Sequence, residues 1–324
     1  KGPPKPFSMK IAQKYSHLHL KKIETLLQNT IHEYRLTALL ILVEQYKKAH
    51  KDFYGKDYRS TYTPIVGEKT DSKQIFNLYR EYQKERVERL SPILRKNMRV
   101  LDIGSSAGHF LYTLRPYVKE CVALEFNKAD VAFMKQKLKL RAYSVSLPET
   151  DLPKEYFDLI TVFQAFEHIE KPLEFLSQVM EYLKPEGRLA IEVPNIDEAL
   201  LTLYDIRPYA DFCFKEAHLF YYSPKTLKTM TEKAGFKGSI SSIQRMNFLN
   251  HINWVMTQSP QKGPHIHMAP AKLATAKDAK PVITKALNAW LQKTDASYRD
   301  FLNRSGIGES IWFVGKKVKK IMHT

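Results

Sequence analysis

Residues 100–110 read VLDIGSSAGHF, and this stretch decides the class of fold. A short apolar strand ends beside an acid, and a turn with two glycines then opens a helix. Gly104 and Gly108 have no Cβ, so the backbone at both positions can approach a ligand closely. The N-terminus of the helix offers N–H groups and a partial positive charge to an anion such as a carboxylate. The stretch therefore predicts a cofactor loop after the first strand of an α/β sheet.

A second acid ends the next predicted strand. Glu125 follows Asp102 by 23 residues, where a carboxylate can bind the two hydroxyls of a ribose. The dinucleotide fingerprint G-x-G-x-x-G is not met, because Ser106 and His109 stand where its second and third glycines belong. A nicotinamide cofactor is therefore the weaker interpretation, and a purely structural glycine turn does not account for Glu125.

Short apolar strands alternate with helices from residue 99 onward, which predicts a parallel α/β sheet. The predicted strands are residues 99–103, 120–125, 142–145, 157–163, 188–193, 239–248 and 309–314. The predicted helices between them are residues 108–114, 128–138, 173–183 and 223–234. Residues 157–163 are almost continuously apolar, as expected for a strand that is covered on both faces. The helix over 173–183 should stop at a Pro/Gly turn, residues 184–187.

Two regions lie outside this alternation. Residues 1–98 form an N-terminal helical region, with predicted helices over 7–50 and 72–94 and a Tyr/Gly/Pro-rich loop at 52–70. The second part of the chain, 99–324, is interrupted by an insertion at 250–308. We expect this insertion to be mainly helical, with a helix over 271–302 and the last strand of the sheet after it. Apolar faces on the N-terminal helices leave a homo-oligomer open.

The chain is strongly basic, with a formal net charge of +17 at pH 7. The lysines are scattered, and the one dense run is in the tail at 316–320. No RNA-binding motif accompanies the charge. An anionic small substrate, such as a nucleotide-linked sugar, would suit the basic surface, and we do not expect a nucleic-acid partner.

The remaining composition indicates a globular protein of a reducing compartment. Cys121 and Cys213 are far apart and have no partners at metal spacing, so neither a disulfide framework nor a zinc site is expected. The longest apolar run is eight residues, 36–43, whereas a bilayer span needs about 20. We predict no membrane span, no signal peptide and a cytoplasmic location.

Four motifs, in the right order, resemble those of class I S-adenosylmethionine-dependent methyltransferases. VLDIGSSAG at 100–108 is similar to the family's VLDIGCGAG. FEHIEKP at 166–172 resembles its EHI-x-x-P turn, and LKPEGRL at 183–189 resembles LKPGGRL. HLFYYSP at 218–224, followed by AGF at 234–236, resembles a stretch of the subset that methylates small molecules and sugars.

The resemblance implies a Rossmann-like, doubly wound sheet of seven strands, the last antiparallel, with S-adenosylmethionine as cofactor. It implies that the methionine part is held by Asp102, Gly104, Ser105 and Gly108. It further implies that Glu125 binds the ribose, that Phe126, Ser146 and Leu147 flank the adenine, and that Gln164 faces the sulfonium.

Methyl transfer requires an aligned acceptor, exclusion of water and, for a hydroxyl acceptor, a base. His168 and His218 lie after predicted strands, and an imidazole pKa near 6.5 suits proton abstraction, although either histidine could instead support its turn. The substrate-binding candidates are Tyr58, Arg59, Asn195 and Tyr222. Asn195 could instead make a turn.

His265 and His267 have no acid or cysteine at ligand spacing, so we expect no metal site.

The resemblance implies that the chain is an S-adenosylmethionine-dependent methyltransferase, and we expect it to act on the hydroxyl of a sugar, free or nucleotide-linked, or of a related small compound. An RNA methyltransferase is an alternative that rests on charge. A second alternative is a binding or scaffold protein that retains the fold without catalysis, because Ser105, Ser106 and Glu186 differ from the residues usual in the family's motifs. The motifs specify the donor and leave N- and C-methylation open.

Overall fold

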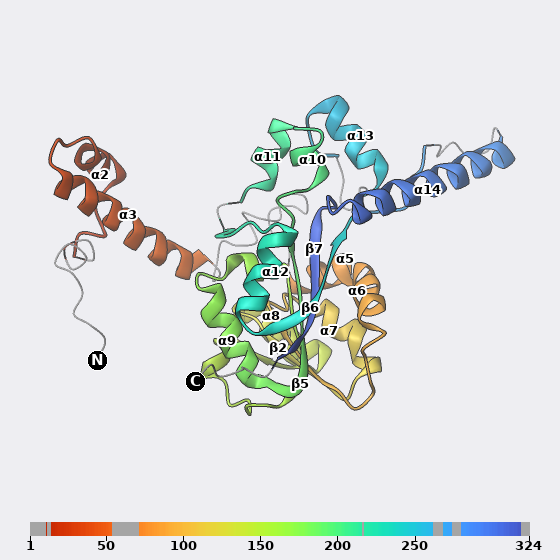
Figure 1. The fold of residues 1–324 in the computed structure, drawn as a ribbon, viewed down its shortest axis with the longest axis horizontal. Coiled ribbons are helices and arrows are strands. Elements are labelled where there is room, and N and C mark those ends of the chain that lie inside the picture. Colours follow the sequence, from red (N-terminus) through yellow and green to blue (C-terminus); the bar gives the residue numbers. More distant parts are fainter. Residues whose placement is uncertain are drawn as a thin grey trace. The chain divides into compact units, whose positions relative to one another are not determined.

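The structure is a computed structural model that describes residues 11, 14–53, 71–215, 217–261, 268–273 and 280–318 (Figure 1). The chain divides into two compact units, Lys1–Pro64 and Ile65–Thr324. The helices between residues 72 and 90, which the sequence analysis assigned to the N-terminal region, thus belong to the same unit as the sheet.

The first unit contains two described helices, α2 (Leu20–Leu27) and α3 (His32–Phe53), so the prediction of one continuous helix over 7–50 was wrong. The break between them is made by polar side chains that bond to local backbone, which competes with a helix. The Asn29 side chain accepts a hydrogen bond from the N–H of Ile31, and the guanidinium of Arg35 donates to the carbonyl of Asn29. A small core of Ile23, Ala38 and Ile41 holds the two helices together.

The second unit is built on one seven-stranded sheet in the order β3-β2-β1-β4-β5-β7-β6. Neighbouring strands are parallel except where β7 pairs antiparallel with both β5 and β6. The predicted Rossmann-like sheet with an antiparallel last strand is therefore confirmed. The strands are β1 (Arg99–Ile103), β2 (Glu120–Leu124), β3 (Arg141–Tyr143), β4 (Phe157–Phe163), β5 (Leu183–Pro194), β6 (Phe236–Ile243) and β7 (Ser310–Lys317).

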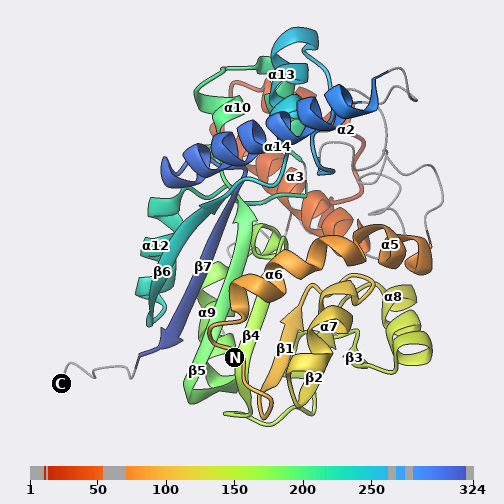
Figure 2. The same ribbon diagram turned by 90° about the vertical axis from the view of Figure 1, so that its right-hand side faces the viewer.

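Helices cover both faces of this sheet (Figures 1 and 2). Successive strand residues point to opposite faces, so Val100 packs in one core cluster and Leu101 in the other. The first face is covered by α5 (Ser72–Tyr79), the 3₁₀ turn Arg80–Tyr82, α6 (Gln83–Leu90), α7 (His109–Leu114) and α8 (Lys128–Phe133), which continues as a π-helix over Met134–Leu138. The second face is covered by α9 (Pro172–Tyr182) and α12 (Pro224–Lys233).

Several predicted boundaries were displaced. The sixth strand was predicted over 239–248, but Asn247 caps a helix by accepting from the N–H of Asn250, so the chain leaves the sheet before that point. The predicted turn at 184–187 is part of β5, which begins at Leu183. The described part of the insertion consists of α13 (Phe248–Thr257) and α14 (Pro281–Arg304), so its long helix starts ten residues later than predicted.

Two short helices, α10 (Ala199–Thr202) and α11 (Arg207–Cys213), follow β5 and pack on α13 through Leu200, Ile206, Tyr209 and Trp254. Together with α13 and α14 they lie beyond the ends of β5, β6 and β7 (Figure 1). In the part of the chain that the structure describes, no helix is both long and apolar enough to cross a membrane.

Candidate active site

The glycine loop after β1 is pressed against the ends of two neighbouring strands. Gly104 has a φ of +78°, and a Cβ on it would lie 2.5 Å from the Cβ of Ala165, in the turn after β4. Its N–H and that of Ser105 both donate to the carbonyl of Leu124 at the end of β2, at 2.8 and 3.1 Å. Gly108 also has a φ of +78° and lies against Met134, so neither position accepts a side chain.

Asp102, at the end of β1, makes hydrogen bonds that hold this loop in place. Its carboxylate is buried and accepts a hydrogen bond from the hydroxyl of Thr161 on β4, at 2.6 Å. Its carbonyl accepts from the hydroxyl of Ser105, at 2.7 Å. Burial raises the pKa of Asp102 to about 6. Asp102 and Ser105, both predicted to hold the methionine part, therefore fasten the loop to the sheet.

Glu125 joins the glycine loop to the end of β2. One carboxylate oxygen accepts from the N–H of Ser106, and the other accepts from the N–H of Asn127, both at 2.8 Å. These two bonds orient the carboxylate between the glycine loop and the end of β2.

The residues predicted near the adenine lie on separate loops. Phe126 is 56% exposed. Ser146 is the N-cap of the 3₁₀ turn Leu147–Glu149, and its N–H and hydroxyl both donate to the carboxylate of Glu149. Leu147 is buried in the core. The side-chain amide of Gln164 donates to Glu192 at 3.0 Å and to Ser310 at 3.2 Å, on the neighbouring strands. Their roles toward the cofactor stay predictions.

Both candidate bases lie in one cluster after β4. Glu167 and His168 belong to the 3₁₀ turn Phe166–His168, and His218 belongs to the segment that precedes α12. This segment is fastened to the turn by hydrogen bonds from the N–H groups of Leu219 and Phe220 to the carbonyl of Glu167, at 2.9 and 3.1 Å. The two imidazole rings therefore meet edge to face, with centroids 4.8 Å apart.

The orientation of His168 follows from one contact. Its Nδ1 lies 2.8 Å from the carbonyl oxygen of Ala217. Because a carbonyl oxygen only accepts hydrogen bonds, Nδ1 carries a proton, and Nε2 of the neutral ring has the lone pair. Sequence reasoning selected both histidines but could not show that they adjoin.

Burial dominates the electrostatics of this cluster. Glu167 is 1% exposed, and neither of its carboxylate oxygens has a hydrogen-bond partner among the described residues. Burial raises the pKa of Glu167 to about 8. Burial, with the neighbouring His168 as a smaller cause, lowers the pKa of His218 to about 4. Tyr222 stacks on Phe166, and its buried hydroxyl has no hydrogen-bond partner in the described part of the chain.

Three of the four predicted substrate contacts lie apart from this cluster or cannot be placed. Asn195 is buried, its amide donates to the carbonyls of Gly306 and Gly308, and its side-chain oxygen accepts from the N–H of Asp197. These are the contacts of the alternative, turn-making role. Tyr58 and Arg59 lie outside the described residues, as do His265 and His267.

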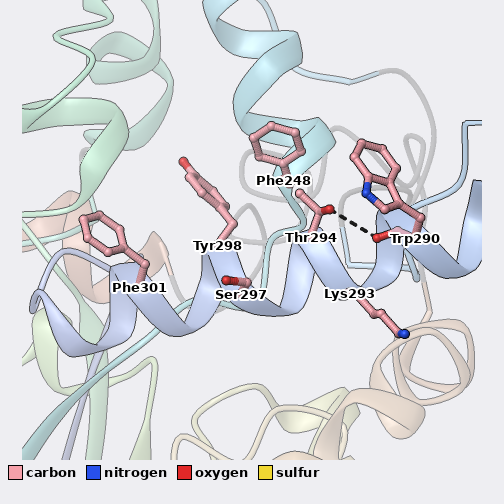
Figure 3. A pocket seen from close by; sticks show the side chains of 7 residues that line it. All are labelled: Phe248, Trp290, Lys293, Thr294, Ser297, Tyr298 and Phe301. Atoms are coloured by element: carbon pink, nitrogen blue, oxygen red, sulfur yellow. Dashed lines mark hydrogen bonds between the residues drawn. The ribbon is translucent and has the colours of Figure 1, made fainter.

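A concave surface lies on the insertion. An open groove of about 580 Å³ runs along α14 between aromatic side chains of that helix and Phe248 of α13 (Figure 3). Trp290, Tyr298 and Phe301 project from one side of α14 (Figure 3). It contains no acid and no histidine among its lining residues, so it offers no base for methyl transfer.

The geometry agrees with comparisons to known proteins. Over 125 residues the chain is 30% identical to an uncharacterized methyltransferase of Bacillus subtilis, YcgJ, covering 35% of this chain and 49% of that protein. Over 187 residues it is 28% identical to a tRNA U34 carboxymethyltransferase of Hydrogenovibrio crunogenus, covering 52% of this chain and 55% of that protein. The chain thus spans about half the length of these curated relatives.

A solved structure shows the same fold. A candidate methyltransferase of Haloferax volcanii, in complex with the Trm112 methyltransferase activator, superposes with a TM-score of 0.51 at 14% identity, over 78% of this chain and 95% of that one. The model of a family described as a methyltransferase domain matches residues 74–239, slightly more than half of the chain. That match contains the glycine loop, Glu125 and the cluster after β4. The chain belongs to the family of class I S-adenosylmethionine-dependent methyltransferases.

Proposed function

We propose that this protein transfers a methyl group from S-adenosylmethionine to a hydroxyl of a sugar, free or nucleotide-linked, or of a related small polyhydroxy compound. The observation that carries the proposal is the buried carboxyl group of Glu167, which has no hydrogen-bond partner among the described residues and lies beside two imidazoles. A hydroxyl can hydrogen-bond to this carboxyl group, and it can transfer its proton to a neutral imidazole. The +17 charge is compatible with an anionic acceptor.

The residues of the glycine loop fit S-adenosylmethionine. The N-cap of α7 is Gly108, which has no side chain, so the start of the helix would present backbone N–H groups and the helix dipole to the methionine carboxylate. Glu125 is oriented at the end of β2 by two backbone N–H groups, and its carboxylate would accept from the ribose hydroxyls. When bound, the cofactor supplies a methyl group on a positively charged sulfur, which needs no further activation.

The chain's own contribution would then be made at the acceptor. Nε2 of His168 would accept the hydroxyl proton, because Nδ1 already donates to Ala217. The low pKa of His218 keeps its ring neutral at pH 7, so it adds no charge beside that proton. Glu167 would orient the acceptor by hydrogen bonding, and the surrounding burial would exclude water.

The test is methyl transfer from isotopically labelled S-adenosylmethionine to a panel of sugars and nucleotide sugars, with amines and thiols in parallel. Labelled product from at least one hydroxyl acceptor, with loss of labelling in Glu167→Gln and retention in the matched variant Glu198→Gln, supports the proposal. Labelling of amines alone, or equal activity of both variants, would exclude hydroxyl methylation at this cluster.

A second candidate acceptor is RNA. One relative carries the name of a tRNA-modifying enzyme, and the chain has 51 basic against 34 acidic residues. Labelling of bulk tRNA, with affinity that falls steeply as salt rises, would favour this acceptor over sugars.

The free thiols of Cys121 and Cys213 support a reducing compartment such as the cytoplasm.

A further inference from the structure

Three metal-ligating side chains converge at the cluster after β4. A carboxylate oxygen of Glu167 and one ring nitrogen each of His168 and His218 all lie within 4.8 Å of one another. In the described part of the chain, no other group of three such residues meets this criterion. Bonds of about 2.0–2.2 Å to a common ion would place neighbouring ligand atoms about 3–3.5 Å apart, so the widest spacing would have to contract by about 1.3–1.8 Å.

The backbone around the cluster restrains all three ligands. Glu167 and His168 are consecutive in one 3₁₀ turn, and two hydrogen bonds fasten the His218 segment to that turn. The bond from Nδ1 of His168 to the carbonyl of Ala217 has the form of the contacts that orient metal-bound histidines in proteins. With Nδ1 engaged in that bond, Nε2 is the nitrogen of His168 that would bind a cation.

The cluster also contains buried polar atoms that the described residues leave without a hydrogen-bond partner. Both carboxylate oxygens of Glu167 and Nδ1 of His218 are buried without a hydrogen-bond partner among the described residues. None of the ion pairs of those residues includes Glu167, and the buried Arg86 already pairs with Glu192. Buried acceptors without partners are costly, and a bound cation removes that cost. Asn195, by contrast, is buried with all its polar atoms bonded.

We propose that Glu167, His168 and His218 bind one divalent transition-metal ion, of the kind that includes Zn²⁺, Mn²⁺ and Fe²⁺. Two imidazoles and one carboxylate are a ligand set for such ions, whereas Mg²⁺ and Ca²⁺ prefer oxygen ligands throughout. Three protein ligands leave at least one coordination position open. That position would take the acceptor's oxygen, and this last role rests on the proposed function, while binding of the ion does not.

The ion would also change how the acceptor is activated. A metal-bound hydroxyl loses its proton far more readily than a free one, so neither histidine would then serve as the base. The proton would leave to solvent, and the oxygen would keep the electron pair with which it attacks.

The experiment is a titration of the tag-free full chain, stripped with a chelator, with Co²⁺ followed by its visible absorption and with Zn²⁺ followed by calorimetry. We expect one ion per chain, and at least a 10-fold loss of affinity in each of Glu167→Gln, His168→Gln and His218→Gln. The matched controls are Glu198→Gln and His251→Gln, which alter a buried acid and a buried histidine outside the cluster. Both should bind Co²⁺ as the wild type does.

The wild type and all five variants are checked for folding by circular dichroism and for S-adenosylmethionine binding by calorimetry. No Co²⁺ or Zn²⁺ bound at micromolar concentration, or equal affinity in the cluster variants and the controls, would overturn the metal site. If the metal fails to bind while S-adenosylmethionine binds, the proposed methyl transfer survives. Metal binding in a protein that methylates no hydroxyl would instead retain the metal site and refute the proposed acceptor.

Discussion

Replacing Gly104 by alanine tests whether the cofactor loop depends on close contact with the turn after β4. Alanine in the left-handed region costs about 1–2 kcal/mol. The new Cβ would lie 2.5 Å from the Cβ of Ala165, where carbon atoms pack at about 3.5–4.0 Å, so one of the two loops has to move by more than about 1 Å. Such crowding adds about 1–3 kcal/mol, for a total loss of about 2–5 kcal/mol.

Gly306 provides a matched control within the same unit. Its φ is +76°, nearly that of Gly104, but a Cβ there would meet no atom within 4 Å. Gly306→Ala should therefore lose only the conformational part, about 1–2 kcal/mol. The two variants and the wild type are compared by urea denaturation, and their affinity for S-adenosylmethionine is measured by calorimetry.

The expected order of stability is wild type, then Gly306→Ala, then Gly104→Ala. Only Gly104→Ala should also weaken cofactor binding and turnover, because a displacement of about 1 Å at the site can reduce the rate about 100-fold. Equal losses of stability in the two variants, or unchanged cofactor binding in Gly104→Ala, would refute the contact between the loops as the reason for the glycine.

Three further outcomes are expected. Glu125→Ala should weaken S-adenosylmethionine binding about 10–100-fold in calorimetry, through loss of about 1.5–3 kcal/mol of charge-assisted hydrogen bonding; unchanged affinity would remove its ribose role. His168→Ala and His218→Ala should retain cofactor affinity and lower kcat about 100-fold or more; full turnover in both would exclude the histidines from the reaction. Burial raises the pKa of Glu198 to about 8, so the folded protein favours the neutral form of this side chain. The resulting contribution to the free energy of unfolding is present below pH 4.5 and is lost as the pH rises from about 4.5 to 8. In urea titrations the wild type should therefore lose stability relative to Glu198→Gln over that range, and a constant difference would contradict the shift.

Strands with strong apolar runs were predicted closely. β1 and β4 have the predicted bounds, because their residues are buried on both faces and no competing local signal is present. The sixth strand was predicted three residues late at its start and five residues late at its end. Few of its residues are buried, so the apolar pattern is weak, and Asn247 already caps the following helix. Polar capping contacts of this kind depend on one or two atoms, so an apolar pattern does not reveal them.

The candidate site was predicted unevenly. Glycine positions such as 104 and 108 were identified because a turn of this type needs them, and both have positive φ. Asn195 was offered as a substrate contact, but its partners, Gly306 and Gly308, come from a distant part of the chain. Glu167 was not among the candidate site residues selected from the sequence, because the burial of its side chain cannot be inferred from neighbouring residues.

The sequence by itself determined the fold, the family and the cofactor loop, because these depend on contiguous motifs and on the order in which strands and helices alternate. Only the tertiary structure decided which polar groups meet. His168 and His218 are 50 residues apart in the sequence. Their rings meet edge to face after β4 because the segment before α12 is hydrogen-bonded to the turn that contains His168. Whether a buried acid is paired, as Glu192 is with Arg86, or has no hydrogen-bond partner among the described residues, as is the case for Glu167, depends on neighbours that only folding brings together.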